Sequence, residues 1–162
     1  KHLDLVLAAG ARLLAGGPVR VWVAGPGDQR ARLAAAPAEA ASCTELLGSL
    51  APDELAARYS RAWVMCLPSE KEAFGMVYVE ALASGTPVVA LSTGGGPESI
   101  VKPGIGVLCE PTVESVADAC RAAIALSSKP ETAAACRQAA RWYDWREGIV
   151  PRLEDLYRSR RT

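Results

Sequence analysis

Residues 63–91 read WVMCLPSEKEAFGMVYVEALASGTPVVAL, and the order of segments within them indicates the fold class. The stretch begins with a short apolar run at 63–67, which has the length and composition of a buried strand. A mostly apolar segment at 75–84 follows and is expected to be a helix, and 87–91 form a second strand-like run. A strand, a helix and a strand in this order predict two parallel strands joined by a crossover helix.

The same alternation continues on both sides of this stretch. Upstream, we expect helices at 3–14, 29–41 (kinked or broken near Pro37) and 52–60, and strands at 19–24 and 45–48. Downstream, we expect a short helix at 97–101, a strand at 106–109, and two or three helices from Val113 onward. Short apolar strands that alternate with helices predict a doubly wound α/β fold, Rossmann-like, with a parallel sheet covered on both faces.

Composition limits the possible classes of protein. The 162 residues suit one domain covering 1–162, and 50% apolar with 22% charged residues excludes wholesale disorder. Eighteen basic residues balance eighteen acidic ones, so the net charge gives no reason to expect nucleic-acid binding. No apolar run approaches the roughly 18–20 residues of a membrane span, and no signal peptide is recognisable. We therefore expect a cytoplasmic protein.

The cysteine and histidine content argues against a metal centre. Five cysteines are widely spaced without a CxxC pair, which is typical of free thiols packed as small hydrophobic residues in a reducing compartment. The only histidine is His2, so the clustered ligands of a zinc site are lacking. We expect no metal and no cofactor.

Ligands of such sheets bind where strands end and loops lead into helices. The loop at 25–29 begins like a dinucleotide fingerprint, but Arg30 occupies the third glycine position, which favours a simple tight turn. The loop at 68–75 is more informative, because the backbone amides around Phe74, Gly75 and Met76 open a helix and form a phosphate site by construction. An acidic first turn that merely complements the helix dipole is the equal alternative.

Glu80 lies in an otherwise apolar helical segment, so we expect a buried carboxylate that something must satisfy. It follows Glu72 by eight residues, or roughly 12 Å of rise if the whole segment is helical. This exceeds the roughly 5–10 Å between paired glycosidase acids and suits a ligand held at two ends. A structural hydrogen bond to a neighbouring loop is the alternative role for Glu80.

A second glycine-rich loop occupies residues 92–99. Three consecutive glycines, Gly94–Gly96, free the backbone to present amides to an anion, and Glu98 is expected to cap or brace the following helix. A flexible crossover turn is an equally good interpretation of this loop.

Four segments in order carry a resemblance to a known family: 67–69, 72–81, 85–90 and 94–98. They resemble the donor-binding C-terminal domain of retaining glycosyltransferases with the GT-B fold, family 4, including its E-x7-E pair. Leu47-Gly48 with Glu54-Leu55 is similar to the loop and helix that precede this motif, and residues 143–162 resemble the closing helix.

The resemblance implies a role for each matched residue. Glu80 would hold the ribose hydroxyls, and Glu72 would face the donor sugar near its reacting carbon, positioning the donor for same-face attack by the acceptor. The amides of Phe74, Gly75 and Met76 would bind the sugar and diphosphate. The remaining implied positions are Leu47 and Gly48 beside the base, Lys1 at the diphosphate, and Ser69, Gly94, Gly95 and Glu98 in supporting loops. A lysine and helix N-termini would stabilise the leaving diphosphate without a metal.

Family members have two such domains, so the resemblance implies that the acceptor-binding domain and the first strand of the donor domain lie outside this chain. Catalysis needs both substrates in one cleft, and we expect this chain alone to bind donor weakly and turn over little or nothing.

The segments at 94–100 and 106–111 are similar to mannosyltransferases that extend lipid-linked oligosaccharides with GDP-mannose. That similarity implies a hexose donor, a lipid-linked acceptor and a place at the cytosolic face of a membrane. A UDP-hexose donor stays open, as do a phosphorylase or epimerase of the same architecture and a non-catalytic nucleotide-sugar-binding or scaffold module.

Overall fold

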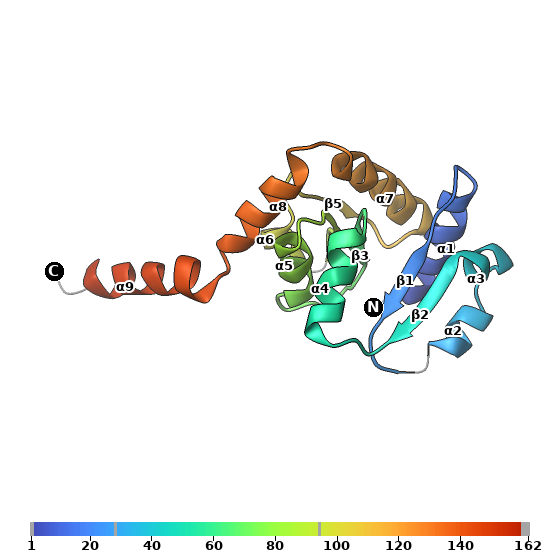
Figure 1. Cartoon of the computed structure of the whole chain (residues 1–162), viewed down its shortest axis with the longest axis horizontal. Helices are drawn as coiled ribbons and strands as arrows, with labels where there is room; N and C mark the ends of the chain where they lie inside the picture. The colour runs from blue at the N-terminus through green and yellow to red at the C-terminus, as the bar shows by residue number, and fades with distance from the viewer. Residues whose placement is uncertain (1, 28, 94, 160–162) are drawn as a thin grey trace.

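The structure is a computed structural model that describes residues 2–27, 29–93 and 95–159. Its helices are α1 (Leu3–Leu14), α2 (Arg30–Ala34), α3 (Ala38–Cys43), α4 (Pro52–Arg61), α5 (Met76–Ala83), α6 (Pro97–Ile100), α7 (Val113–Ser127), α8 (Thr132–Arg141) and α9 (Val150–Ser159), with a π-helical turn at Trp145–Ile149. Its strands are β1 (Val21–Ala24), β2 (Thr44–Gly48), β3 (Met65–Leu67), β4 (Val88–Leu91) and β5 (Gly106–Cys109). Helices and strands alternate as predicted, and the Rossmann-like α/β class is confirmed (Figure 1).

The helix expected at 29–41 is broken into α2 and α3 near Pro37, as its sequence predicts. Pro37 has no N–H to donate and adopts an extended conformation with φ −52° and ψ 146° as the N-cap of α3. Two short helices therefore form where the sequence has one continuous helical pattern.

The expected single sheet is replaced by two sheets in the described part of the chain. One contains β1 and β2, and the other contains β3, β4 and β5 in that order. All three strand pairs are parallel, with Met65 opposite Val88 and Val88 opposite Gly106 in the larger sheet. The prediction of one sheet was wrong because strand-like runs in a sequence do not show which strand edges pair.

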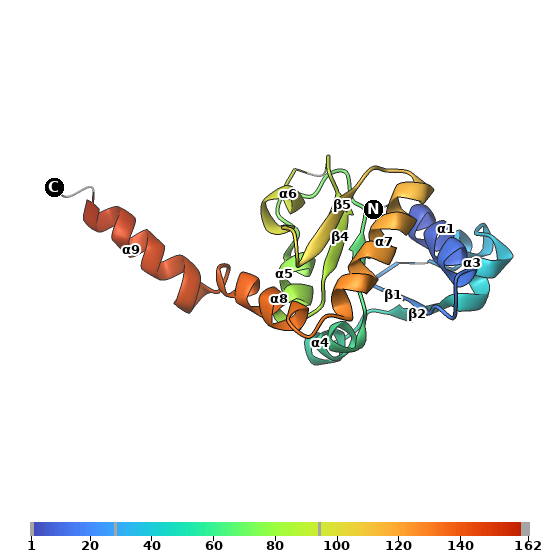
Figure 2. The same ribbon diagram turned by 90° about the horizontal axis from the view of Figure 1, so that it is seen from above.

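The core lies on both faces of β4, whose four residues are all buried. Val88 and Ala90 pack with residues of α5 and α8, including Tyr78, Leu82 and Cys136. Val89 and Leu91 point the opposite way, into a cluster with α1 and α7. Figure 2 shows these two helical layers on either side of the larger sheet.

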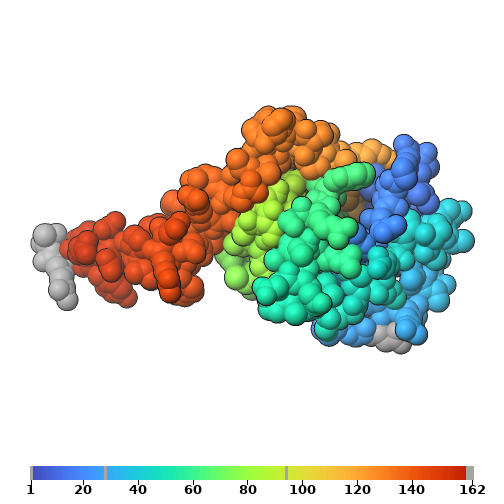
Figure 3. Space-filling view, viewed as in Figure 1, coloured from blue at the N-terminus to red at the C-terminus, as the bar shows by residue number. Residues whose placement is uncertain are grey.

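The chain ends in a helix that leaves the body of the protein. α9 corresponds to the closing helix expected within 143–162, and none of its described residues is buried. Figure 3 shows it extending away from the rest of the molecule. Leu153, Leu156 and Tyr157 are exposed along it.

All five cysteines are free thiols, and four of them are buried, as expected for cysteines packed as hydrophobic residues. Burial raises the pKa of Cys136 to about 11. Across residues 2–27, 29–93 and 95–159, no helix combines the length and the apolar character needed to cross a membrane.

Candidate functional site

Two loops that follow β3 and β4 meet at the carboxyl edge of the larger sheet. Glu72 forms an isolated parallel bridge with Gly95, and the Gly96 N–H donates a 3.0 Å hydrogen bond to the Glu72 carbonyl. A Cβ on Gly96 would lie 2.5 Å from the Ala73 carbonyl oxygen and 2.7 Å from that of Glu72. The loops approach so closely that only glycine fits at position 96.

Gly75 turns the chain from this loop into α5. It is the N-cap of the helix with φ +84° and ψ 63°, a left-handed conformation that favours glycine. A Cβ added there would lie 2.5 Å from Cε2 of Tyr78 and 3.1 Å from Cγ of Glu72. Glycine at 75 thus lets the backbone rest against a buried ring.

Tyr78 holds the start of α5 against the end of β3. Its ring is fully buried, and its hydroxyl donates a 2.6 Å hydrogen bond to the Leu67 carbonyl. Burial, and then the nearby Glu72 carboxylate, raise the pKa of this phenol well above its usual value. The hydroxyl therefore stays protonated and keeps its bond to β3.

The start of α5 offers backbone donors to an anion. No side chain caps Gly75, and no acidic residue lies in the first turn. The exposed Met76 begins the helix beside these amides, and Phe74 is 37% exposed on the other side of Gly75. Free N–H groups and the positive end of the helix dipole at this point can bind a phosphate or another anion.

The expectation that Glu80 is buried was wrong, because its side chain is exposed. Tyr78, Val79, Ala81 and Leu82 are the buried residues of α5. Positions 76, 80 and 83 are spaced at the helical period and form its solvent-exposed stripe. Glu80 therefore shares a face with Met76, and a ligand at the helix start can reach it without displacing the core.

Glu80 also lies near Tyr59 of α4. Burial, and then the Glu80 carboxylate, raise the pKa of Tyr59 from 10.0 to about 12. The Tyr59 carbonyl accepts a 2.5 Å hydrogen bond from the hydroxyl of Thr86, which joins α4 to the turn after α5.

Glu72 lies outside any helix, since α5 begins at Met76. The roughly 12 Å helical rise expected between Glu72 and Glu80 therefore does not apply to the first four residues of that interval. The structure brings together the carboxylate of Glu72 in the loop beside Gly75, the open start of α5, and the carboxylate of Glu80 one helical turn further along.

Aromatic contacts brace the outer side of the loop. The Phe74 ring meets Tyr143 edge to face at a centroid distance of 5.4 Å, and the Tyr143 hydroxyl donates a 3.4 Å hydrogen bond to the Ser99 carbonyl. These contacts connect the loop before α5 to α6 through the segment that follows α8.

The supporting loop residues occupy varied positions. Ser69 is buried, and its N–H donates a 2.9 Å bond to the Leu67 carbonyl. Glu98 is exposed in the first turn of α6, but its side chain does not cap the helix, and its carbonyl accepts a 3.2 Å bond from Lys102. Glu98 was expected to cap or brace α6, but it supports the helix only through its negative charge near the helix start.

The structure describes the two residues expected beside the base but not the lysine expected at the diphosphate. Leu47 and Gly48 end β2, Gly48 has φ +65°, and its carbonyl accepts a 2.8 Å bond from the Gly25 N–H. Leu47 lines the cavity between the two sheets. Lys1 and Gly94 lie outside the described residues.

His2 and Glu70 form a 3.2 Å contact between the start of α1 and the loop after β3. This contact is an ion pair when the imidazole is protonated. It places the start of α1 at the same carboxyl edge as Glu72 and Gly75.

Sequence reasoning overlooked Tyr78, Tyr143 and Tyr59 as residues that shape this edge. The glycine run 94–96 hinted at close packing, but which of its members needs to lack a side chain depends on a contact with a distant loop. Among the described residues, no group of three or more acidic, cysteine or histidine side chains is placed to hold a metal ion.

Comparison with known proteins places the chain in a family. Residues 1–142 match the sequence profile of a family described as glycosyl transferases group 1. The chain belongs to this family. A D-inositol 3-phosphate glycosyltransferase of Corynebacterium diphtheriae is 49% identical over 59 residues, which are 36% of this chain and 14% of that protein. A glycogen synthase of Mycobacterium tuberculosis is 36% identical over 107 residues, 63% of this chain and 25% of the relative.

Two solved structures share the fold of this family member. The sucrose-phosphate synthase of Thermosynechococcus elongatus has a TM-score of 0.75 at 27% identity, covering 96% of this chain and 41% of that one. Anabaena HepE in complex with UDP and glucose has a TM-score of 0.71 at 22% identity, covering 98% and 44%. This chain thus spans less than half the length of these structural neighbours.

Proposed function

We propose that this chain is the donor-binding half of a GT-B glycosyltransferase that moves a hexose, with retention, from a nucleoside diphosphate sugar to an acceptor. The observation that carries the proposal is the open start of α5, where Gly75 exposes backbone amides between Glu72 and the exposed Glu80. Membership of the glycosyl transferases group 1 family supports interpreting this anion site as a place for a sugar-linked diphosphate.

Each residue of the site has a proposed part in this function. The amides of Phe74, Gly75 and Met76 bind the diphosphate and stabilise the charge that develops on it as the sugar leaves. Glu80 accepts hydrogen bonds from the ribose hydroxyls. Glu72 orients the hexose for same-face attack by the acceptor and does not itself attack. Lys1 adds a positive charge at the diphosphate, and no metal takes part.

Two nucleotide sugars are candidate donors, and they differ in both the base and the sugar. Similarity in the segments at 94–100 and 106–111 favours GDP-mannose. A UDP-hexose is the second candidate, and it is supported by the fold shared with Anabaena HepE, whose structure contains UDP and glucose. We propose further that the acceptor, a lipid-linked oligosaccharide for the mannosyltransferase alternative, is held by a second domain outside this chain.

The test is a calorimetric titration of the chain with GDP, UDP, GDP-mannose and UDP-glucose. Substitution Glu80→Gln should lower the affinity for every ligand about tenfold or more, since hydrogen bonds to a charged group contribute about 1.5–3 kcal/mol. Substitution Glu72→Gln should lower the affinity for the nucleotide sugars and leave the affinity for the bare nucleotides nearly unchanged. Glu39→Gln, an exposed carboxylate of α3, is the matched control and should change nothing.

The comparison of variants also separates the alternatives. Equal binding by the parent chain, Glu80→Gln and Glu39→Gln would contradict the donor site at α5. Donor binding without transfer, in a protein that also contains an acceptor domain, would favour the non-catalytic binding module.

A further inference from the structure

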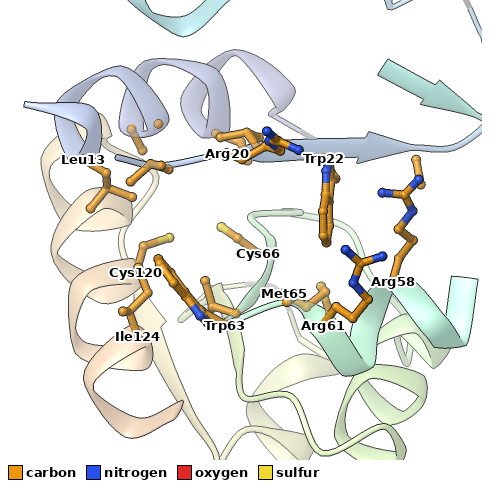
Figure 4. A pocket seen from close by; sticks show the side chains of 18 of the residues that line it. Leu13, Arg20, Trp22, Arg58, Arg61, Trp63, Met65, Cys66, Cys120 and Ile124 are labelled. Atoms are coloured by element: carbon orange, nitrogen blue, oxygen red, sulfur yellow. The ribbon is translucent and has the colours of Figure 1, made fainter. Parts of the chain in front are cut away.

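Two of the five cysteines face each other where β3 packs against α7. Cys66 is the middle residue of β3, and Cys120 belongs to α7. Both pack in the core cluster that contains Val89 and Leu91. Both side chains also line the cavity of about 540 Å³ between the two sheets, and Figure 4 shows their sulfur atoms directed toward one another. The fold therefore brings together two thiols from distant segments of the chain.

The other three cysteines are engaged elsewhere. The Cys109 thiol donates a 3.4 Å hydrogen bond to the Ala90 carbonyl, so it is directed at the neighbouring strand β4. Cys136 lies in the cluster on the other face of the larger sheet. Cys43 ends α3, where its thiol donates a hydrogen bond to a carbonyl of the same helix. The geometry thus selects one pair among the five thiols.

The two members of this pair differ in acidity. The hydrogen bond that Cys66 donates to Cys120 raises the pKa of Cys66, and burial raises it further. Cys120 accepts this bond, which lowers its pKa in spite of burial, and the Arg121 guanidinium lowers it as well. Because the thiolate is the nucleophilic form of cysteine, Cys120 is the member that attacks an oxidant, and Cys66 is its resolving partner.

The cavity gives a small oxidant access to both sulfur atoms. Cys66 is only partly buried, although the adjacent strand β4 is buried throughout. Cys120 is buried in the core cluster, yet its side chain borders the same cavity. Redox-sensitive cysteines combine an accessible, acidic thiol with a second cysteine close by, and the pair has these properties.

We propose that Cys66 and Cys120 are a site of reversible oxidation, at which hydrogen peroxide converts the two thiols to a disulfide that joins β3 to α7. The Cys120 thiolate attacks one peroxide oxygen, the O–O bond breaks, and the leaving hydroxide takes up a proton to become water. Cys120 is then a sulfenic acid. The Cys66 sulfur loses its proton and attacks the Cys120 sulfur, and the S–O bond breaks to release a second water. A dithiol reductant restores both thiols.

The disulfide would act on the loop that follows β3. The carbonyl of Leu67, the residue after Cys66, accepts bonds of 2.6 Å from the Tyr78 hydroxyl and 2.9 Å from the Ser69 N–H. Joining Cys66 to α7 restrains the end of β3 and should slow local opening of this loop. The loop carries Glu72, so control of donor binding by oxidation rests on the proposed function. The disulfide itself depends only on the two cysteines.

The test treats the folded, fully reduced chain with hydrogen peroxide, blocks the remaining thiols with N-ethylmaleimide and maps disulfides by mass spectrometry. Trypsin is combined with a glutamate-specific protease, because cleavage after Glu110 and Glu114 separates Cys109 from Cys120. We expect the disulfide between Cys66 and Cys120 to exceed every other pairing at least tenfold. A different dominant pairing, or the absence of any disulfide, would overturn the proposal.

Two variants test the role of the attacking thiol. Cys120→Ala removes it, and Cys109→Ala is the matched control from the same cluster. Peroxide should consume the Cys66 thiol at least tenfold more slowly in Cys120→Ala than in the parent chain, whereas Cys109→Ala should match the parent. Equal rates in the two variants would contradict the proposal.

A further control needs no variant and applies even if the substituted chains do not fold. In urea, closure of the short loop between Cys109 and Cys120 is favoured over closure of the longer one from Cys66. Peroxide should therefore lose its preference for Cys66 and Cys120 when the parent chain is unfolded. The same preference in the unfolded chain would show that the fold does not select the pair.

Hydrogen exchange measures the effect on the loop. Amides at 67–72 should exchange at least threefold more slowly in the oxidised than in the reduced protein, with α2 and α3 as an unaffected reference. Equal exchange in the two forms would overturn the restraint of the loop. This readout requires no donor, so it is independent of whether the proposed function holds.

Discussion

Substitution Gly75→Ala tests how tightly the loop after β3 is fitted to α5. Two costs combine at this position. The left-handed conformation at φ +84° costs a residue with a Cβ about 1–2 kcal/mol. The Cβ would also approach Cε2 of the fully buried Tyr78 to 2.5 Å, and such overpacking costs about 1–3 kcal/mol. The unfolding free energy should therefore fall by about 2–5 kcal/mol.

Gly104 provides the matched control, since it has φ +89° but nothing within 4 Å of an added Cβ. Gly104→Ala should cost only the conformational part, about 1–2 kcal/mol. The difference between the two variants, about 1–3 kcal/mol, isolates the contact with Tyr78. At this chain length each kcal/mol corresponds to about 2–4 °C in Tm.

Urea unfolding followed by circular dichroism measures both variants, provided that the m-value stays unchanged. Asparagine tolerates the left-handed conformation, so Gly75→Asn should remain costly while Gly104→Asn becomes nearly neutral. Equal losses of stability at positions 75 and 104, for both alanine and asparagine, would refute the close packing of Gly75 against Tyr78.

Three further outcomes follow from the same edge of the sheet. Gly96→Ala should destabilise by about 1–3 kcal/mol, measured by urea unfolding, because its Cβ would lie 2.5 Å from a carbonyl oxygen. Tyr78→Phe should cost about 0.5–1.5 kcal/mol in the same assay, since the Leu67 carbonyl loses its hydroxyl donor but keeps the N–H of Ser69. Glu80→Gln should lower the pKa of Tyr59 from about 12 while keeping it above 10.0, because burial is the larger cause of the shift. The pKa is measured from tyrosinate absorbance during a pH titration, with Tyr59→Phe identifying the signal of this residue. Because the folded pKa is raised, the stability that Tyr59 contributes is complete below pH 10.0 and is lost as pH rises through about 12.

Local sequence signals predicted the elements well because each depends on neighbouring residues. Pro37 predicts the break between α2 and α3, and Pro52 with Asp53 and Glu54 predicts the start of α4. The apolar runs that became β3 and β4 are recognisable by length and composition alone. These features need no knowledge of distant contacts.

The exposure of Glu80 could not be predicted in the same way. α5 is apolar on most sides, so no polar face stands out in its sequence, and a single glutamate among apolar residues suggests burial. Its actual exposure depends on where α4, α6, α8 and β4 pack around the helix. Only the stripe at positions 76, 80 and 83 is left free, and the sequence alone does not reveal which stripe that is.

The meeting of the two loops is likewise a long-range property. The bond from the Gly96 N–H to the Glu72 carbonyl joins segments that are separated by the whole of α5 and β4. Adjacent parallel strands place their following loops at one edge, which the alternation does predict. The exact register of the contact, with Gly96 rather than its neighbours pressed against Ala73, depends on the three-dimensional path of both loops.

The two carboxylates of the site stand in different surroundings, and this bears on how donor binding should be measured. Glu72 lies beside the buried Tyr78, whose pKa it helps to raise, whereas Glu80 lies on the solvent-exposed stripe of α5. Hydrogen bonds from a ribose to an exposed carboxylate replace bonds to water, so their net contribution should grow when water is excluded from the site. On the proposed function, a domain covering this edge would strengthen the same contacts. The informative quantity for this chain is therefore the difference in affinity between Glu80→Gln and Glu39→Gln, and that difference should widen when the acceptor domain is present.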